Sequence, residues 1–335
     1  MTKYRVLVLT DHRGHSAENS IYALLQQMRQ HPSCAHLAVA SRGASANTAF
    51  FENPIGTPLF AAAVTADFAY SEDGQLMRAG EQEVDPQDFD VVFLRLPRPV
   101  TDEYLLQLEQ LFERQVIINR PSGIIETSSK AFLLELGEVC PPMRLVRSVD
   151  DVLAFAEEFP IVLKPLRGYG GAGVLKVNGN KLDDGNAVHD TREYLQQLTQ
   201  ELEEDGMLAM QFLKNVSQGD KRTIVVAGEI MASSLRMPAT DSWLCNVAQG
   251  GTSVPAVATE EEVEMIATIH PKLEAAGILI YGVDTLVNDD GKRVLSEVNT
   301  LSIGGFPQSE RQQGRPIISP TIDKIFRYAD QHFAG

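Results

Sequence analysis

The stretch PIVLKPLRGYGGAGVLKV, residues 160–177, predicts two apolar strands joined by a glycine-rich loop. Glycine has no Cβ, so the backbone of such a loop can approach the phosphates of a ligand closely. Gly168, Gly170 and Gly173 also match the dinucleotide-binding pattern G-x-G-x-x-G letter for letter. That pattern needs a helix directly after the glycines, whereas a second strand pattern follows them here. We therefore interpret the segment as a hairpin that folds over nucleotide phosphates, with a plain surface hairpin as the alternative.

Two lysines are candidates for phosphate binding. Lys164 lies on the first strand among apolar residues. An ammonium group there must reach water, pair with an acid or contact a ligand to avoid a desolvation cost, so its position favours a functional role. Lys130 follows residues 127–129 in a predicted helix at 126–137. Taken alone, it is typical of a solvent-exposed helix lysine.

Three oxygen-bearing side chains near the C-terminus form a candidate metal site. If Asp290-Gly291 makes a two-residue type I′ turn, the resulting hairpin places Asp284 opposite Glu297. Asn299 shares the face of Glu297, because side chains of a strand alternate between its two faces. Carboxylate and amide oxygens suit Mg²⁺. The alternative is a solvated polar face, and a change of one residue in the turn would remove Asp284 from the group.

Other residues carry weaker signals. Arg222 begins a predicted strand after a turn, where its guanidinium could bind a phosphate or carboxylate, or lie on the surface. Asn246 belongs to a glycine-containing segment suited to close approach of a ligand, although a plain loop explains it equally well. His12 and His15 could touch a substrate or simply be loop residues. No pattern typical of a serine hydrolase or a zinc protease is present.

Composition excludes several functional classes. The 335-residue chain is 44% hydrophobic with a formal net charge of −16, which is typical of a folded protein and argues against a nucleic-acid or anionic-membrane surface. Its three cysteines are widely spaced and form neither a zinc motif nor a disulfide framework. No apolar run approaches the membrane-spanning length of about 18 residues. These features predict a cytoplasmic protein without a nucleic-acid or membrane partner.

The order of strand and helix patterns predicts an α/β (α+β) fold of three lobes. Residues 1–120 alternate strands and helices as in an open α/β domain, residues 121–206 contain the glycine hairpin, and residues 207–335 combine antiparallel strands with helices. In the last lobe a helix at 259–276 starts with Thr259 and Glu262 in capping-box spacing, and 319–333 forms a closing helix.

The motifs, taken in order, resemble bacterial glutathione synthetases of the ATP-grasp carboxylate–amine ligase superfamily. The resemblance extends over residues 90 to 300 approximately. It rests on Lys130, Lys164-Pro165-Leu166, the glycine hairpin, Gly219-Asp220-Lys221-Arg222, Asn246-x-Ala248-x-Gly250-Gly251, Gly282-Val283-Asp284 and Glu297-x-Asn299.

The resemblance implies a site residue by residue. An N-terminal α/β domain, a small central lid lobe and a C-terminal antiparallel lobe would hold ATP between the second and third lobes. Asp284, Glu297 and Asn299 would bind Mg²⁺ or Mn²⁺, and Arg222 would steady a phosphate or a substrate carboxylate. The residues expected at the nucleotide are Lys130, Lys164, Gly168, Gly170, Gly171, Gly173, Gln211, Leu213 and Asn246.

The implied enzyme is an ADP-forming ligase. It would transfer the γ-phosphoryl group of ATP to a substrate carboxylate, after which an amine attacks the acyl phosphate and gives an amide. γ-Glutamylcysteine and glycine are the leading small-molecule substrates, and family analogy implies a homo-oligomer. Leu244-Cys245 and the loop at 300–306 depart from the family pattern where substrate should lie. They leave two alternatives open: a ligase for other amino acids or peptides, and an ATP-binding protein without turnover.

Overall fold

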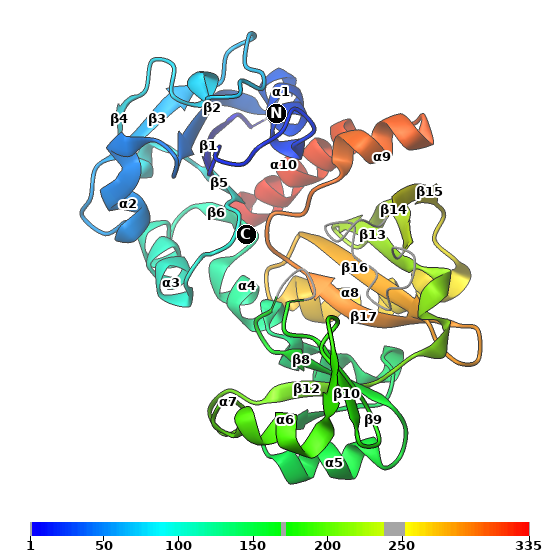
Figure 1. Ribbon diagram of the computed structural model, residues 1–335. Helices are drawn as coiled ribbons and strands as arrows, with labels where there is room; N and C mark the ends of the chain where they lie inside the picture. Colours follow the sequence, from blue (N-terminus) through cyan, green and yellow to red (C-terminus); the bar gives the residue numbers. More distant parts are fainter. Residues whose placement is uncertain (1, 169–171, 238–251, 335) are drawn as a thin grey trace.

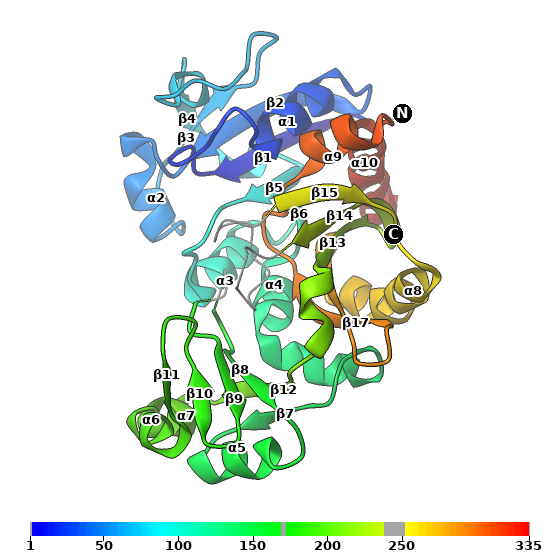
Figure 2. The same cartoon turned by 45° about the vertical axis from the view of Figure 1, so that its right-hand side comes forward.

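Three β-sheets organise the chain in the computed structural model, which describes residues 2–168, 172–237 and 252–334 (Figure 1). Each sheet carries helices, so the protein has the mixed α/β class that the sequence predicts. Figures 1 and 2 both place the C-terminal sheet between the N-terminal lobe and the central lobe.

The N-terminal sheet is mostly parallel. β1 lies in its middle, parallel to β2 and β5, and its side chains are almost all buried. Hydrophobic residues on both faces of β1 explain this position, because parallel strands are covered by helices on both sides. The strand order is β4 (Gln82–Val84), β3 (Leu59–Ala63), β2 (Cys34–Ser41), β1 (Tyr4–Thr10), β5 (Val91–Arg95) and β6 (Val116–Ile118).

The last helix, α10 (Ile318–Ala334), packs against α1 (Ser20–Gln30) and β6 of this N-terminal sheet (Figure 1). Ile322, Ile325 and Phe326 belong to the same hydrophobic cluster as Val6 of β1. The sequence predicted the helix but grouped it with the C-terminal lobe. Its burial shows that the N-terminal domain is completed by the other end of the chain.

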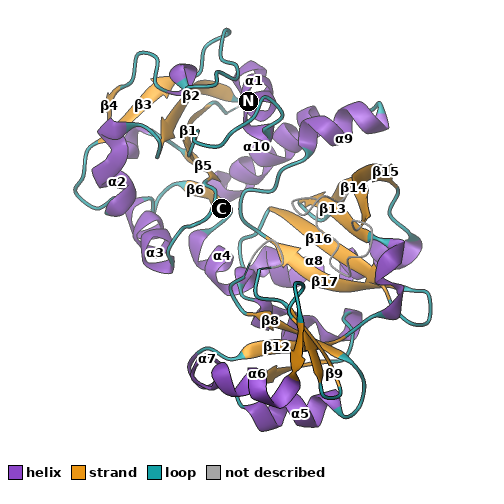
Figure 3. Ribbon diagram, viewed as in Figure 1, coloured by secondary structure: helices purple, strands orange, loops and turns teal. Residues whose placement is uncertain are grey.

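The central sheet is antiparallel throughout. Its strand order is β11 (Val188–Asp190), β10 (Lys181–Asp183), β9 (Leu175–Asn178), β8 (Ile161–Pro165), β12 (Met207–Gln211) and β7 (Met143–Val146). The helices α5 (Val149–Ala156), α6 (Thr191–Gln197) and α7 (Thr199–Glu204) cover one face and share a separate core with it (Figure 3). Because β12 pairs with β8 and β7, this sheet ends at Gln211, a few residues beyond the predicted lobe boundary at 206.

The C-terminal sheet has the strand order β15 (Thr252–Ala256), β14 (Glu229–Met237), β13 (Asp220–Val226), β16 (Ile280–Val287) and β17 (Arg293–Asn299). All its described pairs are antiparallel. The helix α8 (Glu260–Ala275) packs against β17, and the predicted capping box between Thr259 and Glu262 is present. The remaining helices are α2 (Thr48–Glu52), α3 (Asp102–Leu111), α4 (Pro121–Ser128) and α9 (Phe306–Gln313), with short 3₁₀ turns at Ser45–Asn47, Gln75–Met77, Pro86–Asp88 and Lys214–Gln218.

Lys130 is not inside the single helix that the sequence predicted at 126–137. α4 ends at Ser128, and a 3₁₀ segment, η4 (Lys130–Val139), begins at Lys130. Ser129 between them has extended backbone, and its hydroxyl accepts a hydrogen bond from the Ala131 amide at 3.3 Å. Serine competes for backbone hydrogen bonds in this way, which explains why it interrupts a helical pattern. The break puts Lys130 at the start of a helix rather than on an exposed side of one.

Candidate functional site

The β16–β17 hairpin brings the three predicted metal ligands together. Asp284 lies directly opposite Glu297, as predicted, and Asn299 follows two residues later on the same strand. The predicted two-residue turn is wrong, however, because Val287 pairs with Arg293 and the Asn288 amide donates to the Lys292 carbonyl at 2.8 Å. The loop is therefore wider than a type I′ turn.

A bulge restores the register that the wider loop would have shifted. Thr285 pairs with Leu295 and Asp284 with Glu297, which leaves Ser296 as the extra residue of β17. A bulge of this kind places two residues of one strand opposite one of the other. The Ser296 hydroxyl donates to the Asp284 carbonyl at 3.0 Å and so ties the bulge to the strand beside it.

Asp284 is buried and surrounded by positive charge. Arg222, its neighbour on β13, holds the carboxylate through two hydrogen bonds, one of them 2.6 Å from Nη2 to Oδ2. Arg236 Nη2 lies 2.8 Å from the same Oδ2, and Asn299 Nδ2 lies 3.4 Å from it. Burial alone would raise the pKa of Asp284, but the two guanidinium groups outweigh burial and hold the pKa below its usual range.

Arg236 and Asp220 complete this charge cluster. Sequence reasoning gave Asp220 no role of its own and did not identify Arg236. They are cross-strand partners on β13 and β14, and their side chains form an ion pair. Burial, helped by the charge of Asp284, raises the pKa of Asp220 to about 7. Asp220 Oδ1 and Arg236 Nε have no hydrogen-bond partner among the described residues. The alternation of Asp220 and Arg222 on one strand, opposite an arginine on the next, was the signal that could have identified the pair.

Lys164 and Lys130 approach this hairpin from the central part of the chain. The ammonium of Lys164, on β8, donates a hydrogen bond at 3.3 Å to the carbonyl of Ser296, the bulge residue. Lys130 donates through Nζ to the Gly168 carbonyl and through its backbone amide to the Leu166 carbonyl at 2.9 Å. Burial lowers the pKa of both lysines, and the charge of Glu297 opposes that fall in both. Two partly buried cations beside one carboxylate suit an anionic ligand.

The glycine hairpin forms between β8 and β9, which pair antiparallel as predicted. Gly173 has a φ of +70°, and a Cβ there would lie 2.9 Å from Pro165 Cγ, so glycine is required. At Gly168 a Cβ would lie 3.2 Å from the Ala172 carbonyl oxygen. Gly170 and Gly171 lie outside the described residues, as do Leu244, Cys245 and Asn246.

Gln211 and Leu213 follow directly from the central sheet. Gln211 is the last residue of β12, and its backbone amide donates to the Pro142 carbonyl at 2.9 Å. Leu213 is buried. Between them the ring of Phe212 lies 3.7 Å from the ammonium of Lys176 on β9. The segment therefore combines an apolar wall with a partly buried amide, which suits a planar base.

The donor set of the hairpin fits a hard divalent cation in part. Glu297 and Asn299 share one face of β17 and offer oxygen atoms, and the charge of Glu297 acts on both lysines. Asp284 is instead occupied by Arg222 and Arg236. Among residues 2–168, 172–237 and 252–334, no group of three or more His, Cys, Asp or Glu side chains is arranged to hold a metal ion.

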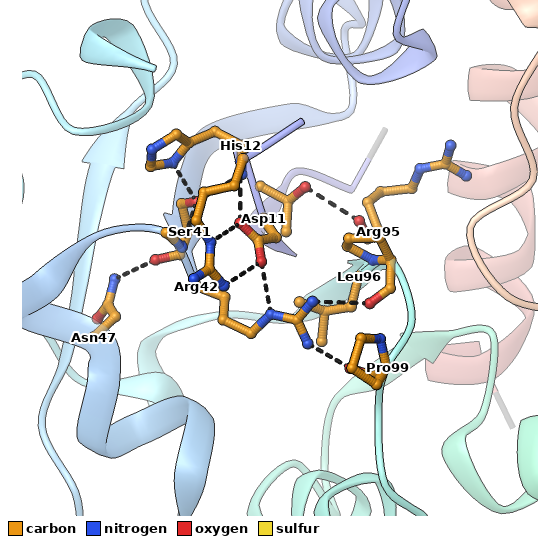
Figure 4. Close-up of polar contacts among 12 residues, drawn as sticks. Asp11, His12, Ser41, Arg42, Asn47, Arg95, Leu96 and Pro99 are labelled. Atoms are coloured by element: carbon orange, nitrogen blue, oxygen red, sulfur yellow. Dashed lines mark hydrogen bonds and ion pairs between the residues drawn. The ribbon is translucent and has the colours of Figure 1, made fainter. Parts of the chain in front are cut away.

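Histidines at the carboxyl edge of the N-terminal sheet have structural partners (Figure 4). His12 Nδ1 lies 2.7 Å from the Ser41 hydroxyl, and His15 Nδ1 lies 3.2 Å from the Tyr22 hydroxyl. Asp11 binds Arg13 at 2.6 Å and Arg42 at 2.8 Å. Burial would raise the pKa of Asp11, but these hydrogen bonds lower it to about 2. These contacts lie at the end of β1 in the N-terminal sheet, and none of them is to Lys130 or Lys164.

Comparisons with known proteins agree with this geometry. Residues 129–314 match a family model described as the prokaryotic glutathione synthetase ATP-grasp domain. A glutathione synthetase of Rhodopseudomonas palustris is 31% identical over 76% of this chain and 79% of its own length. One from Bradyrhizobium diazoefficiens is 30% identical over 71% of this chain and 73% of its own.

Solved structures share the fold at lower identity. A D-cycloserine synthetase has a TM-score of 0.65 and 14% identity, with 97% of this chain and 99% of that chain covered. The ATP-grasp ligase PsnB in complex with a precursor peptide and AMPPNP has a TM-score of 0.58 and 15% identity over 97% and 98% of the two chains. The three-lobed ATP-grasp architecture expected from the sequence is thereby confirmed.

Proposed function

Because this chain belongs to the prokaryotic glutathione synthetase family of ATP-grasp ligases, we propose that it joins γ-glutamylcysteine to glycine at the site between Lys164 and the β16–β17 hairpin. Its general activity follows from the family: it is an ATP-dependent ligase that forms an amide bond and releases ADP. The specific acid and amine, the metal and the role of each residue are parts of the proposal.

One observation carries this proposal. Lys164, from the central sheet, donates to the carbonyl of Ser296, the bulge residue of β17 that directly precedes Glu297. The lysine that would bind phosphate thus contacts the strand whose Glu297 and Asn299 would bind a metal ion. These groups come from two lobes, and the γ-phosphoryl group of ATP would lie between them.

Lys130 and Lys164 would neutralise the phosphates while the acid substrate approaches, since two anions must meet before the phosphoryl group can move. Arg222 would orient the substrate carboxylate or the transferred phosphoryl group, and its hydrogen bonds to Asp284 fix the position of its guanidinium group. Glu297 and Asn299 would hold Mg²⁺ or Mn²⁺, which supplies positive charge at the phosphate oxygens when bound.

The chemistry then proceeds in two balanced steps. The cysteine carboxylate oxygen of γ-glutamylcysteine takes the γ-phosphoryl group, and ADP leaves. The amine of glycine attacks the carbonyl carbon of the acyl phosphate, an amide bond forms, inorganic phosphate leaves with the bonding pair, and the nitrogen loses a proton to solvent. The glycine hairpin, including Gly168 and Gly173 with Gly170 and Gly171, would exclude water that could hydrolyse the acyl phosphate.

The remaining expectations belong to the same proposal. Gln211, Leu213 and Asn246 would contact the nucleotide. The three lobes would follow the divisions at 1–120, 121–206 and 207–335, except that the central sheet extends to Gln211 and α10 packs on the N-terminal lobe. We infer a cytoplasmic homo-oligomer that acts on small molecules. Within the described parts of the chain, no helix is long and apolar enough to cross a membrane.

Phosphate release tests the proposal. With ATP and Mg²⁺, γ-glutamylcysteine plus glycine should stimulate release, and mass spectrometry should detect glutathione. Glu297→Gln should lower the rate by at least about 100-fold and weaken Mg²⁺-dependent nucleotide binding, because a ligand charge is lost. Glu83→Gln, the same change on an exposed strand of the N-terminal sheet, is the control and should change neither.

Leu244-Cys245 and the loop at 300–306 favour a second candidate, a ligase for other amino acids or peptides. A product-mass screen of donors and acceptors separates the two, since only one pair should give both phosphate release and a new amide. If no pair stimulates release and Glu297→Gln leaves nucleotide binding unchanged, the ligase site assigned here is wrong.

A further inference from the structure

Asn119 makes a concentrated set of contacts between the N-terminal domain and the C-terminal lobe. It lies between β6 and α4 and is 6% exposed. Its Nδ2 donates to the Ile280 carbonyl at 2.6 Å and to the Thr300 carbonyl at 2.7 Å. Its Oδ1 accepts from the Leu279 amide at 2.8 Å and from the Ile280 amide at 2.9 Å. The side-chain amide therefore uses both donors and both acceptor positions on the backbone of another lobe.

The four backbone groups lie at the open end of the β16–β17 hairpin. Ile280 begins β16, and Thr300 follows Asn299, the last residue of β17. The ladder between these strands stops at the pair Gly282 and Asn299. The amide of Asn119 continues the hydrogen bonding beyond that pair, so it bridges the two strands where they would otherwise separate.

Neighbouring contacts hold the same segment from the same side. The Thr127 hydroxyl, on α4, donates to the Thr300 hydroxyl at 2.9 Å. Arg95 at the end of β5 donates to the Ile303 carbonyl at 2.6 Å, and the Ser302 hydroxyl donates to the Leu96 carbonyl at 2.7 Å. The backbone that leaves Asn299 is thus fixed by the N-terminal domain and by α4, not by the C-terminal lobe alone.

We propose that Asn119 is a positioning residue for the metal-binding end of the hairpin: it sets the separation of β16 and β17 and so the placement of Asn299 and Glu297 relative to Asp284. This inference rests on the proposed function, because it gives the hairpin a metal to bind. Partners outside the ligand set commonly tune metal affinity by about 10- to 100-fold.

Asn119→Asp tests the proposal with an isosteric change. One oxygen can still accept from Leu279 and Ile280, but the other replaces the NH₂ group and faces the carbonyls of Ile280 and Thr300, which lie 2.6 and 2.7 Å from Nδ2. The Mg²⁺ concentration for half-maximal phosphate release should rise by about 10-fold or more. The rate at saturating Mg²⁺ and the KM of both substrates should change by less than about threefold, because the residue touches no substrate.

Asn47→Asp is the matched control. Asn47 is fully buried in the N-terminal domain and exchanges hydrogen bonds of 2.8 Å with the backbone of Phe60. It also donates to the Ser41 carbonyl at 3.3 Å (Figure 4). Its substitution should lower thermal stability and leave the Mg²⁺ requirement unchanged. If both variants shift the Mg²⁺ requirement equally, Asn119 acts only through general stability and the proposal is wrong.

A second variant decides the question if Asn119→Asp does not fold. Thr127→Val keeps the side-chain shape but removes the hydroxyl that anchors Thr300, so the Mg²⁺ requirement should rise by about two- to threefold. An unchanged requirement would overturn the proposal. A wild-type enzyme that releases phosphate without any divalent ion would overturn the metal site itself, which distinguishes failure of the proposed function from failure of this inference.

Discussion

Single residues of the charge cluster on β13, β14 and β16 show how the pKa of a carboxyl group depends on its position. Asp284 and Asp220 lie on neighbouring strands among the same two arginines, yet their pKa values shift in opposite directions. Asp284 makes close contacts to both guanidinium groups, whereas Asp220 has only Arg236 and keeps one oxygen without a partner in the described structure. Burial therefore dominates at Asp220, and paired charge dominates at Asp284.

Asp220 should make stability depend on pH. Its pKa is raised to about 7, mainly by burial, whereas an unfolded aspartate titrates near pH 3.9. The folded state binds more protons between these values, so the contribution of Asp220 to stability falls as pH rises from about 4 to 7. The side chain of Asp220→Asn stays neutral at every pH. Its free energy of unfolding relative to wild type, measured with denaturant, should therefore be higher at pH 8 than at pH 5, on the order of 1–2 kcal/mol.

Asp290→Asn is the control for this comparison, because Asp290 lies in an exposed turn and its substitution should give the same small difference at both pH values. A stability difference between Asp220→Asn and wild type that does not vary with pH would mean that Asp220 stays ionised in the folded protein.

Elements of secondary structure reveal what the sequence could and could not predict about the site. The pairing of Asp284 with Glu297 was predicted correctly, although the turn on which the prediction rested is wrong. The wider loop shifts the strand register by one residue, and the bulge at Ser296 shifts it back. Side-chain alternation fixes which face a residue occupies, whereas loop width and bulges depend on tertiary contacts such as the one from Lys164 to Ser296. The bulge could therefore not be predicted from strand patterns alone, whereas the alternation of Asp220 and Arg222 gave a signal for the pair with Arg236.

The first turn of α8 gives a prediction at this scale. Glu262, expected only to cap the helix, also accepts hydrogen bonds from Lys221 on β13 at 2.6 Å and from Thr285 on β16 at 2.5 Å. Lys221→Met would leave this buried carboxylate with only the more distant Arg293, 3.9 Å away, as a described counter-charge and should cost about 3–5 kcal/mol of unfolding free energy. Lys214→Met removes an ion pair whose lysine is 77% exposed and should cost less than about 1 kcal/mol.

Denaturant unfolding of both lysine variants measures the contrast. Equal losses would show that the Lys221–Glu262 pair is no stronger than a surface pair, and that α8 is held to the sheet by its apolar face alone.

At the scale of the whole molecule, the two ends of the chain form one domain. The sequence predicted a closing helix at 319–333, but a helical pattern alone does not identify the sheet on which the helix packs. In the structure the face of α10 meets β1: Phe326 stacks on Tyr4 with ring centres 6.2 Å apart, and the Tyr4 hydroxyl donates to Asp330 at 2.7 Å. The chain thus leaves the C-terminal lobe and returns to close the N-terminal one.

Phe326→Ala should therefore loosen the N-terminal domain rather than the lobe that precedes α10 in sequence. Phe326 is 1% exposed, so its removal should cost about 3–5 kcal/mol, whereas Phe333→Ala, at a residue 45% exposed on the same helix, should cost about 1 kcal/mol. Amide hydrogen exchange should become faster in β1 and α1 of Phe326→Ala and stay unchanged in the central sheet, which has its own core. Faster exchange confined to β13–β17 would mean that α10 stabilises the C-terminal lobe instead.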